Sequence, residues 1–95
     1  MDIDRLLRRA WRRSAEQSAR LRVACAPVDG GLSMLETVVR LTITLLPDEE
    51  ERVLWIEGRF GGEPVEGIAS LIERDPQSLR AVVNALHVAV EGRDR

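Results

Sequence analysis

The feature that constrains the fold most is the start of a helix near residue 76, because it fixes where one element ends and the next begins. Asp75 has the side chain of a good N-cap, whose carboxylate can accept from the free backbone N–H groups of a first helical turn. Pro76 follows at the first helical position, where its missing N–H costs nothing and its fixed φ suits a helix. Apolar residues then recur at spacings of three and four, which predicts a helix over 76–91 with one apolar stripe: Leu79, Val82, Val83, Leu86 and Val90.

The chain has the length of one domain and the composition of a globular protein. Its 95 residues are 44% hydrophobic and 32% charged, which is typical of a folded soluble chain and not of a disordered one. No apolar run approaches the ~20 residues needed to cross a membrane. The charged N-terminus also lacks the apolar core of a signal peptide. We therefore expect a cytoplasmic protein without a membrane partner.

Residues 1–20 are predicted to form a basic amphipathic helix, covering 2–20, that acts as an arm before a single domain at 21–92. Residues 1–22 carry seven arginines and three acidic residues, a net charge of +4, so the remainder carries −6 of the total −2. One interpretation is a solvated basic face on a helix that docks through its apolar residues. The other is an arm that contacts RNA phosphates, with which arginine pairs well. The candidate RNA contacts are Arg5, Arg8, Arg9, Arg12 and Arg13.

The middle of the chain favours β-structure. Leu21, Val23 and Cys25 alternate with other residues, which predicts a strand over 21–27 that ends at a turn. Two further strands are predicted over 52–60 and 67–74, and together they form a hairpin that leads into the last helix. Residues 32–46 fit helical and strand spacing equally well, and a helix over 64–73 competes with the last strand.

The expected fold is therefore α+β. We expect a three-stranded antiparallel sheet with two helices on one face, plus the N-terminal amphipathic basic helix. The second helix of this arrangement would be residues 32–46, although the spacing of their apolar residues leaves a strand open there.

The sequence offers little catalytic chemistry. It contains no HExxH, no paired CxxC, no Gly-rich phosphate loop before a helix and no serine set up with a base. The single histidine, His87, suits a packing or surface role, and the single cysteine, Cys25, is expected to be buried and inert. The acidic run 48–51 is interpreted as a solvated turn, and Trp55 and Phe60 as core residues. We therefore expect neither an enzyme nor a bound cofactor or metal.

Three segments carry a resemblance to a known family: Leu-Leu-Pro-Asp at 45–48, Leu-Ile-Glu-Arg-Asp at 71–75 and Ser-Leu-Arg-Ala-Val-Val-Asn at 78–84. With elements in the order strand, helix, strand, strand, helix, residues 21–91 resemble the small dimerising subunit of the KEOPS complex, a family related to the CTAG/LAGE proteins of archaea and eukaryotes. The basic helix at 2–20 and the end of the last helix depart from the family's pattern. These departures indicate a diverged paralogue.

The resemblance implies a non-catalytic scaffold in tRNA threonylcarbamoyladenosine modification. In that family two copies pair into a continuous sheet, and the helices bind the catalytic KEOPS subunit. The implied partners are a second copy or a paralogue, that catalytic subunit and, through the basic helix, tRNA. The implied protein interface lies on the last helix: Leu79, Arg80, Val82, Val83, Asn84, Leu86 and Val90.

A second resemblance involves the Leu-Pro pair at 46–47 with the acidic residues after it, Ile-Ala-x-Leu at 68–71 and Pro-x-Ser-Leu-Arg at 76–80. These segments resemble the helix-turn-helix of sigma-factor region four, which implies that residues 79–90 lie in the major groove of DNA. Only Arg80, Asn84 and His87 are available there to reach phosphates and base edges. An unrelated small protein-interaction domain is the third interpretation.

Overall fold

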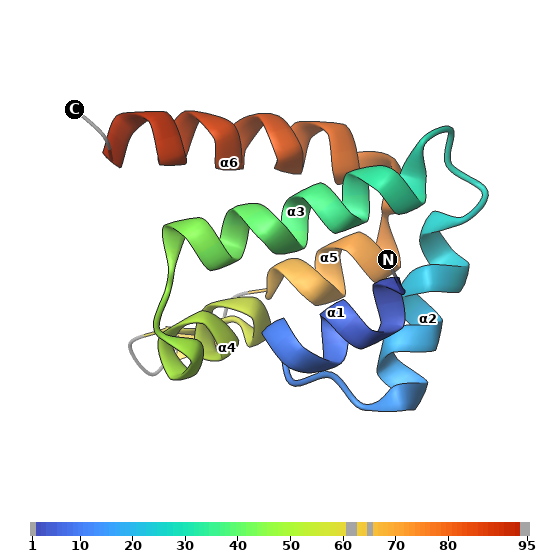
Figure 1. Cartoon of the computed structure of the whole chain (residues 1–95), viewed down its shortest axis with the longest axis horizontal. Helices are drawn as coiled ribbons and strands as arrows, with labels where there is room; N and C mark the ends of the chain where they lie inside the picture. Colours follow the sequence, from blue (N-terminus) through green and yellow to red (C-terminus); the bar gives the residue numbers. More distant parts are fainter. Residues whose placement is uncertain (1, 61–62, 65, 94–95) are drawn as a thin grey trace.

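The computed structural model describes residues 2–60, 63–64 and 66–93 and is built almost entirely of helices (Figure 1). A short 3-10 helix at Pro76–Ser78, η1, precedes the last helix. Within the described ranges the one extended pairing is antiparallel and joins two-residue segments, β1 at Arg59–Phe60 and β2 at Glu63–Pro64. The α-helices are α1 Ile3–Ala10, α2 Ala15–Cys25, α3 Gly31–Leu45, α4 Glu49–Glu57, α5 Ile68–Arg74 and α6 Leu79–Arg93.

The predicted α+β fold is wrong, because the described residues contain no three-stranded sheet. The strands expected over 21–27, 52–60 and 67–74 fall largely in α2, α4 and α5. Residues 32–46, for which helix and strand were both open, form α3. The short apolar runs that indicated strands lie in helices that bury only some members of each run, since Val23 and Leu54 are exposed. A run of four to eight residues cannot distinguish such a helix from a strand.

The N-terminal region is two helices and not the single helix predicted over 2–20. Arg12 takes a left-handed backbone conformation with φ of 51°, which ends α1. Ser14 then starts α2 with a reciprocal cap: its hydroxyl accepts from the Gln17 backbone N–H at 3.1 Å, and its own N–H donates to the Gln17 side chain at 3.0 Å. Such a capping box satisfies two backbone donors that an abrupt helix start would leave free.

The acidic run 48–51 is a helix start and not the turn that the sequence suggested. The Asp48 carboxylate accepts from the Glu51 backbone N–H at 2.9 Å, which caps α4. The three glutamates of the first turn are exposed and favourably placed, because the N-terminus of a helix carries partial positive charge. Gly58, with φ of 75°, ends the helix in the left-handed conformation that glycine adopts without strain.

The last helix was predicted correctly in type and approximate extent, but its start differs from the prediction. The Asp75 side chain makes no capping bond. Its backbone carbonyl instead accepts from the Ser78 N–H at 3.0 Å and from the Ser78 hydroxyl at 2.7 Å. Pro76 therefore opens the 3-10 helix η1, and α6 continues from Leu79.

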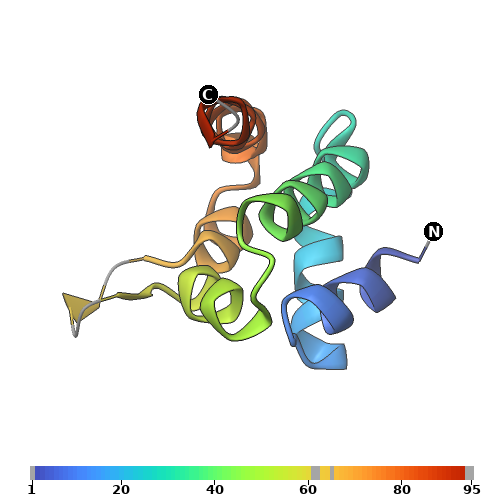
Figure 2. The ribbon, with the colours of Figure 1, turned by 60° about the vertical axis from the view of Figure 1, so that its left-hand side comes forward.

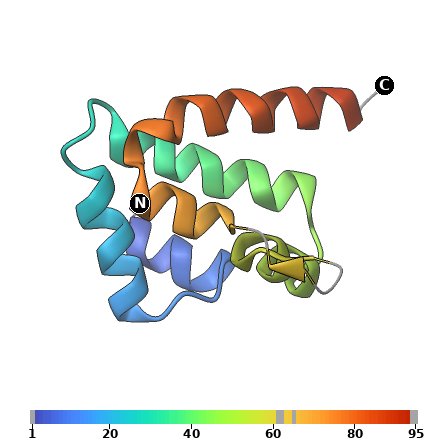
Figure 3. The ribbon, with the colours of Figure 1, turned by 180° about the vertical axis from the view of Figure 1, so that it is seen from behind.

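The centre of the molecule is α3, whose Leu35, Val38, Val39 and Thr42 are buried. Its most extensive contact is with α6, which runs along it, and α1 also packs against it (Figures 1 and 2). The view from behind shows α6 and α3 as an upper layer over the shorter helices (Figure 3). The core thus includes residues from the predicted arm at 1–20 as well as from the predicted domain at 21–92.

Two buried polar or reactive groups are accommodated in this core. Thr42 accepts a hydrogen bond from the Trp11 indole N–H at 2.9 Å and donates its own hydroxyl proton to the Val39 carbonyl at 2.6 Å. Cys25 is a free and fully buried thiol, which confirms the prediction of its burial. Burial raises the pKa of this thiol to about 11, so that it is protonated and unreactive at neutral pH.

Candidate anion-binding face of helix α1

The candidate site begins with the two faces of α1. Leu7 and Ala10 point into the core together with Trp11, which directly follows the helix. The remaining faces carry arginines, because the apolar positions occupy only the helical spacing that faces α2 and α3. Three of these, together with two arginines of the segment that follows α1, surround one surface hollow of about 390 Å³ and are called the arginine face: Arg5, Arg8, Arg9, Arg12 and Arg13. The structure thus brings together the five arginines that the sequence singled out as candidate RNA contacts.

Other arginines of the N-terminal region are paired with carboxylates, and so is one member of the arginine face. Arg12 Nε donates to Glu49 Oε1 at 3.0 Å. Arg22 Nε donates to Asp4 Oδ1 at 3.0 Å, and Arg20 Nε lies 3.9 Å from Glu73 Oε1.

Three members of the arginine face have no such neutralising partner. Within residues 2–60, 63–64 and 66–93, neither a hydrogen bond nor an ion pair joins Arg5, Arg8 or Arg9 to a carboxylate. All three are exposed. A chain that has more acidic than basic residues therefore concentrates uncompensated positive charge on one short helix.

Arg13 differs from the other members because it is half-buried at the inner edge of the arginine face. Its Nε is enclosed and makes no hydrogen bond to the part of the chain that is described. Burial lowers the pKa of this guanidinium from its ordinary value, while the charges of Glu73 and Glu57 act in the opposite direction. An enclosed donor without an acceptor is costly, on the order of 1–3 kcal/mol, but an anion outside the protein cannot reach this Nε in the structure as it stands.

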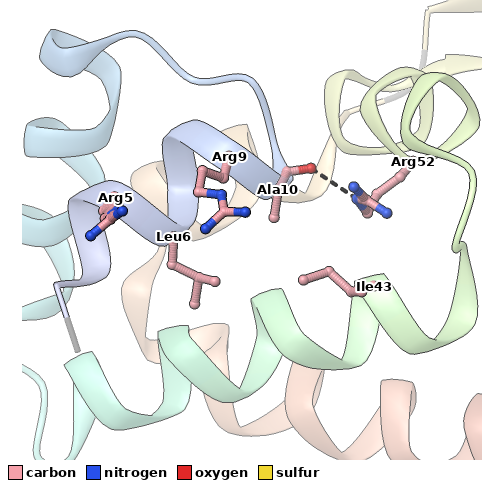
Figure 4. A pocket seen from close by; sticks show the side chains of 6 residues that line it. All are labelled: Arg5, Leu6, Arg9, Ala10, Ile43 and Arg52. Carbon is pink, nitrogen blue, oxygen red and sulfur yellow. Dashed lines mark hydrogen bonds between the residues drawn. The ribbon is translucent and has the colours of Figure 1, made fainter.

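Beside the arginine face lies a second hollow of about 460 Å³, which we call the α1–α3 cleft. Figure 4 shows the side chains of α1, α3 and α4 that surround it. Half of its lining is apolar and half is guanidinium, with no carboxylate: Arg5, Leu6, Arg9, Ala10, Ile43 and Arg52. Because Arg5 and Arg9 line both hollows, the cleft and the arginine face are continuous.

Arg52 is the residue of this site that the sequence analysis missed. Only 7% of it is exposed, and its guanidinium joins the ends of two helices. Nε donates to the Ala10 carbonyl at 2.8 Å (Figure 4), while Nη1 donates to the Leu46 carbonyl at 2.9 Å and approaches the Pro47 carbonyl at 3.3 Å. Carbonyls at helix C-termini carry partial negative charge, which explains how this cation is held without a carboxylate.

A signal for Arg52 was present in the sequence. Arg52 and Ile56 are four residues apart and are the two buried side chains of α4 among Arg52–Ile56, whereas the apolar Leu54 between them is exposed. An arginine at a core-facing position of an amphipathic helix is unusual, because arginine is rarely buried without a partner. The expected strand over 52–60 concealed this spacing.

The predicted interface residues of α6 lie in a different place. Leu79 and Leu86 are buried, and Val82, Val83 and Val90 are half-buried, so much of this stripe is covered by the chain itself. The exposed positions include Arg80, Asn84 and His87. Helix α3 lies between α6 and α1 (Figures 1 and 2), so the polar residues of α6 and the arginine face do not form one surface.

The remaining candidates from the sequence are metal-ligating groups and the aromatic residues Trp55 and Phe60. In the described ranges no group of three or more His, Cys, Asp or Glu side chains is placed to hold a metal ion. Trp55 packs against the core as predicted, while the side chain of Phe60 lies outside the described residues. Among the helices that the structure describes, none is both long and apolar enough to span a membrane.

Known proteins provide no further guide to this site. Neither a protein-family model, nor a curated protein, nor a solved structure matches the chain. Its function must therefore be inferred from its own residues, of which the arginine face and the adjoining cleft are the most distinctive.

Proposed function

We propose that this chain is a non-catalytic binding module that contacts the phosphate backbone of a nucleic acid through the arginine face of α1. The observation that carries the proposal is the lack of a carboxylate partner for Arg5, Arg8 and Arg9 among the described residues. Guanidinium groups bind phosphate oxygens through two parallel N–H donors, which suits them to this partner better than a simple point charge.

The dimensions of α1 fit this role. A helix of eight residues is about 12 Å long at ~1.5 Å per residue. One strand of a nucleic acid presents a phosphate about every 3.4 Å along a B-form axis. The arginine face can therefore meet roughly three phosphates of one strand.

The two family resemblances are affected differently by the helical fold. The KEOPS scaffold function stays a prediction, but the continuous sheet through which that family pairs has no counterpart in the described residues. A DNA-reading role for α6 also stays a prediction, and it would rest on Arg80 as the one exposed arginine before Arg93. The arginine face offers several guanidiniums, which is why we place the nucleic-acid contact on α1.

The test is the salt dependence of binding. Fluorescence anisotropy would measure the affinity for a labelled tRNA and for a labelled DNA duplex over a series of salt concentrations. In the double variant Arg5→Gln/Arg9→Gln, the slope of log K against log salt should fall by about 0.7 per lost contact on a single strand and about 0.9 on a duplex. At low salt we expect the affinity to fall at least about tenfold.

Arg80→Gln is the control, because it makes the same type of substitution at an exposed position on α6, although it removes one charge where the double variant removes two. It should leave the affinity and the salt slope unchanged. The proposal is wrong if neither nucleic acid binds at low salt, or if the double variant binds with the same affinity and slope as the natural chain. A loss confined to Arg80→Gln would move the contact from α1 to α6.

A further inference from the structure

The α1–α3 cleft has a feature that contact with phosphates alone does not require, namely an apolar floor. Leu6 and Ala10 from α1 and Ile43 from α3 form this floor between the guanidiniums (Figure 4). Ile43 is 37% exposed, so the floor is open to a ligand and not sealed inside the core. A volume of about 460 Å³ lies within the range of roughly 300–1,000 Å³ that is usual for pockets that hold small organic groups.

The polar groups around this floor are suited to an anion joined to a flat, partly apolar body. Arg5 and Arg9 stand at the boundary between the cleft and the arginine face, where a phosphate would lie. Arg52 lines the cleft, and its second amino group, Nη2, makes no hydrogen bond to the described residues. Its N–H groups can therefore donate to carbonyl or ring-nitrogen acceptors of a bound group, while the planes of guanidiniums stack well on aromatic rings.

We infer that the α1–α3 cleft holds one unstacked nucleotide of a single-stranded nucleic acid. Its base lies on the floor of Leu6, Ala10 and Ile43, and its phosphate lies between Arg5 and Arg9. This inference rests on the proposed function and narrows it from nucleic acids in general to single strands. Bases of a duplex are stacked inside the helix, and extruding one costs a few kcal/mol, so a paired strand would engage the arginine face but leave the cleft empty.

The experiment compares three labelled probes with the natural chain by fluorescence anisotropy. The first is a single-stranded RNA of 12 nucleotides, the second is the same strand in a full duplex, and the third is a strand of equal length in which every base is absent. A single-stranded DNA of the same sequence is measured in parallel, because both nucleic acids share this chemistry. We expect the single strand to bind about tenfold more tightly than the abasic strand and than the duplex, the order expected of one stacked base.

A variant of the floor tests where the base lies. Ile43→Ser removes the apolar side chain from the floor without adding a charge beside Arg5 and Arg9, and should weaken binding of the single strand about tenfold while leaving duplex binding within about twofold. Val88→Ser is the control, because Val88 is 68% exposed on α6, away from the cleft. Circular dichroism of each variant checks folding, and the abasic strand tests the inference on the natural chain even if Ile43→Ser fails to fold.

The outcomes separate this inference from the proposed function. If the single strand binds no more tightly than the abasic strand and the duplex, the contact with phosphates stands and the inference about the base is wrong. If no probe binds at low salt, the proposed function itself is wrong. If Ile43→Ser weakens the single strand and the duplex equally, the base does not lie on this floor, and the inference fails although the arginine face is retained.

Discussion

Helices α1 and α6 have similar apolar patterns but present different surfaces to solvent. Leu7 and Ala10 of α1 are buried, as are Leu79 and Leu86 of α6, and both helices pack against α3. On the outer side, α1 carries arginines that lack carboxylate partners in the described structure. The outer side of α6 is mostly small or uncharged.

The difference teaches how to assign a role to an amphipathic helix. An apolar stripe identifies the face that will be buried, but it does not say whether the covering surface belongs to the same chain or to a partner. On α6 the covering surface is largely α3 of the same chain. The outer face is more informative for function, because charge that folding leaves uncompensated must be balanced by solvent ions or by a ligand.

The largest loss of stability is expected from replacing Trp11, which follows α1 and belongs to its inner face. Trp11→Ala removes a side chain that is almost fully buried, together with the hydrogen bond from its indole to Thr42. We expect the free energy of unfolding to fall by about 3–5 kcal/mol, as for other large-to-small changes in a core. Urea unfolding followed by circular dichroism would measure it, provided that the m-value stays constant.

Trp11→Phe is the matched control for this substitution. It retains an aromatic ring and removes the N–H donor, while the Thr42 hydroxyl still donates to the Val39 carbonyl. The loss should therefore be smaller, about 1–2 kcal/mol. An unchanged unfolding midpoint for Trp11→Ala would mean that α1 is an arm independent of the core.

The next effect concerns the inner and outer sides of α6. Leu79→Ala should cost about 2–4 kcal/mol, because Leu79 is fully buried. Val88→Ala should change the stability by less than about 0.5 kcal/mol, because its side chain is mostly exposed. Light scattering should show that both variants have the same oligomeric state as the natural chain. If Val88→Ala alone alters that state, the outer side of α6 is an interface after all.

The fold was hard to predict because apolar residues alternate, as they do in strands, within short segments that form helices. Leu21, Val23 and Cys25 alternate as a strand would, but Val23 is 62% exposed while Leu21 and Cys25 are buried one helical turn apart. The polar Ser18 completes the inner face of α2, which interrupts the apolar stripe and hides the helical period. In α3, packing against α1, α2 and α6 outweighs the strand preference of its Val, Ile and Thr residues.

Two helix starts were nevertheless readable from the sequence. Ser14 and Gln17 have the spacing of a capping box, and Asp48 stands directly before three glutamates that suit a first turn. Greater weight on these capping signals, and less on alternation over short runs, would have indicated α2 and α4. The Asp75-Pro76 signal worked because it marked the end of one element and the start of the next.

The candidate site was predictable only in part. The five arginines between positions 5 and 13 stand out in the sequence, but their neutralisation depends on contacts between distant residues, such as that of Arg12 with Glu49. The sequence could indicate that Arg52 is buried but not that a cleft forms, because Arg52 and Ile43 reach α1 only through the packing of α3 and α4. Composition therefore predicts an anionic partner, whereas the tertiary structure shows which arginines of the arginine face have no carboxylate partner among the described residues and can bind an anion.

On the outer face of α1 we expect a substitution to raise the free energy of unfolding slightly, whereas the core substitutions lower it. Arg5 and Arg9 are four residues apart on a helix, where like charges repel, and Arg5 also lies near the positive N-terminal end. Arg5→Gln should therefore stabilise the fold by about 0.2–0.5 kcal/mol at low salt, and less at high salt. Thermal unfolding at two salt concentrations would measure this change.

His87→Gln on α6 is the comparison for Arg5→Gln. His87 is exposed on α6, so its replacement should leave the stability unchanged within a few tenths of a kcal/mol. A loss of stability in Arg5→Gln would instead reveal a favourable contact of Arg5 within the chain. The arginine face would then be a structural feature and not a charge held for a ligand.

The smallest expected effect on stability concerns the ion pair between Arg12, which follows α1, and Glu49 of α4. The hydrogen bond from Arg12 and its charge lower the pKa of the Glu49 carboxyl from its ordinary value. Because the folded pKa is the lower one, this pair contributes stability above the ordinary pKa of glutamate and loses it as the pH falls through the folded value. The contribution is small and screened by salt, since both side chains are about half exposed.

Titration of Glu49 by NMR therefore serves as a sensor of the arginine face. Arg12→Gln should return the pKa of Glu49 toward its ordinary value, while Glu66, whose pKa is lowered by Arg74, should not change. If Arg12 exchanges its ion pair with Glu49 for one with a phosphate, saturating single-stranded RNA should also return the pKa of Glu49 toward its ordinary value. A Glu49 pKa that RNA leaves unaltered would restrict the phosphate contacts to the arginines without carboxylate partners, because Arg12 would then remain a structural link between α1 and α4.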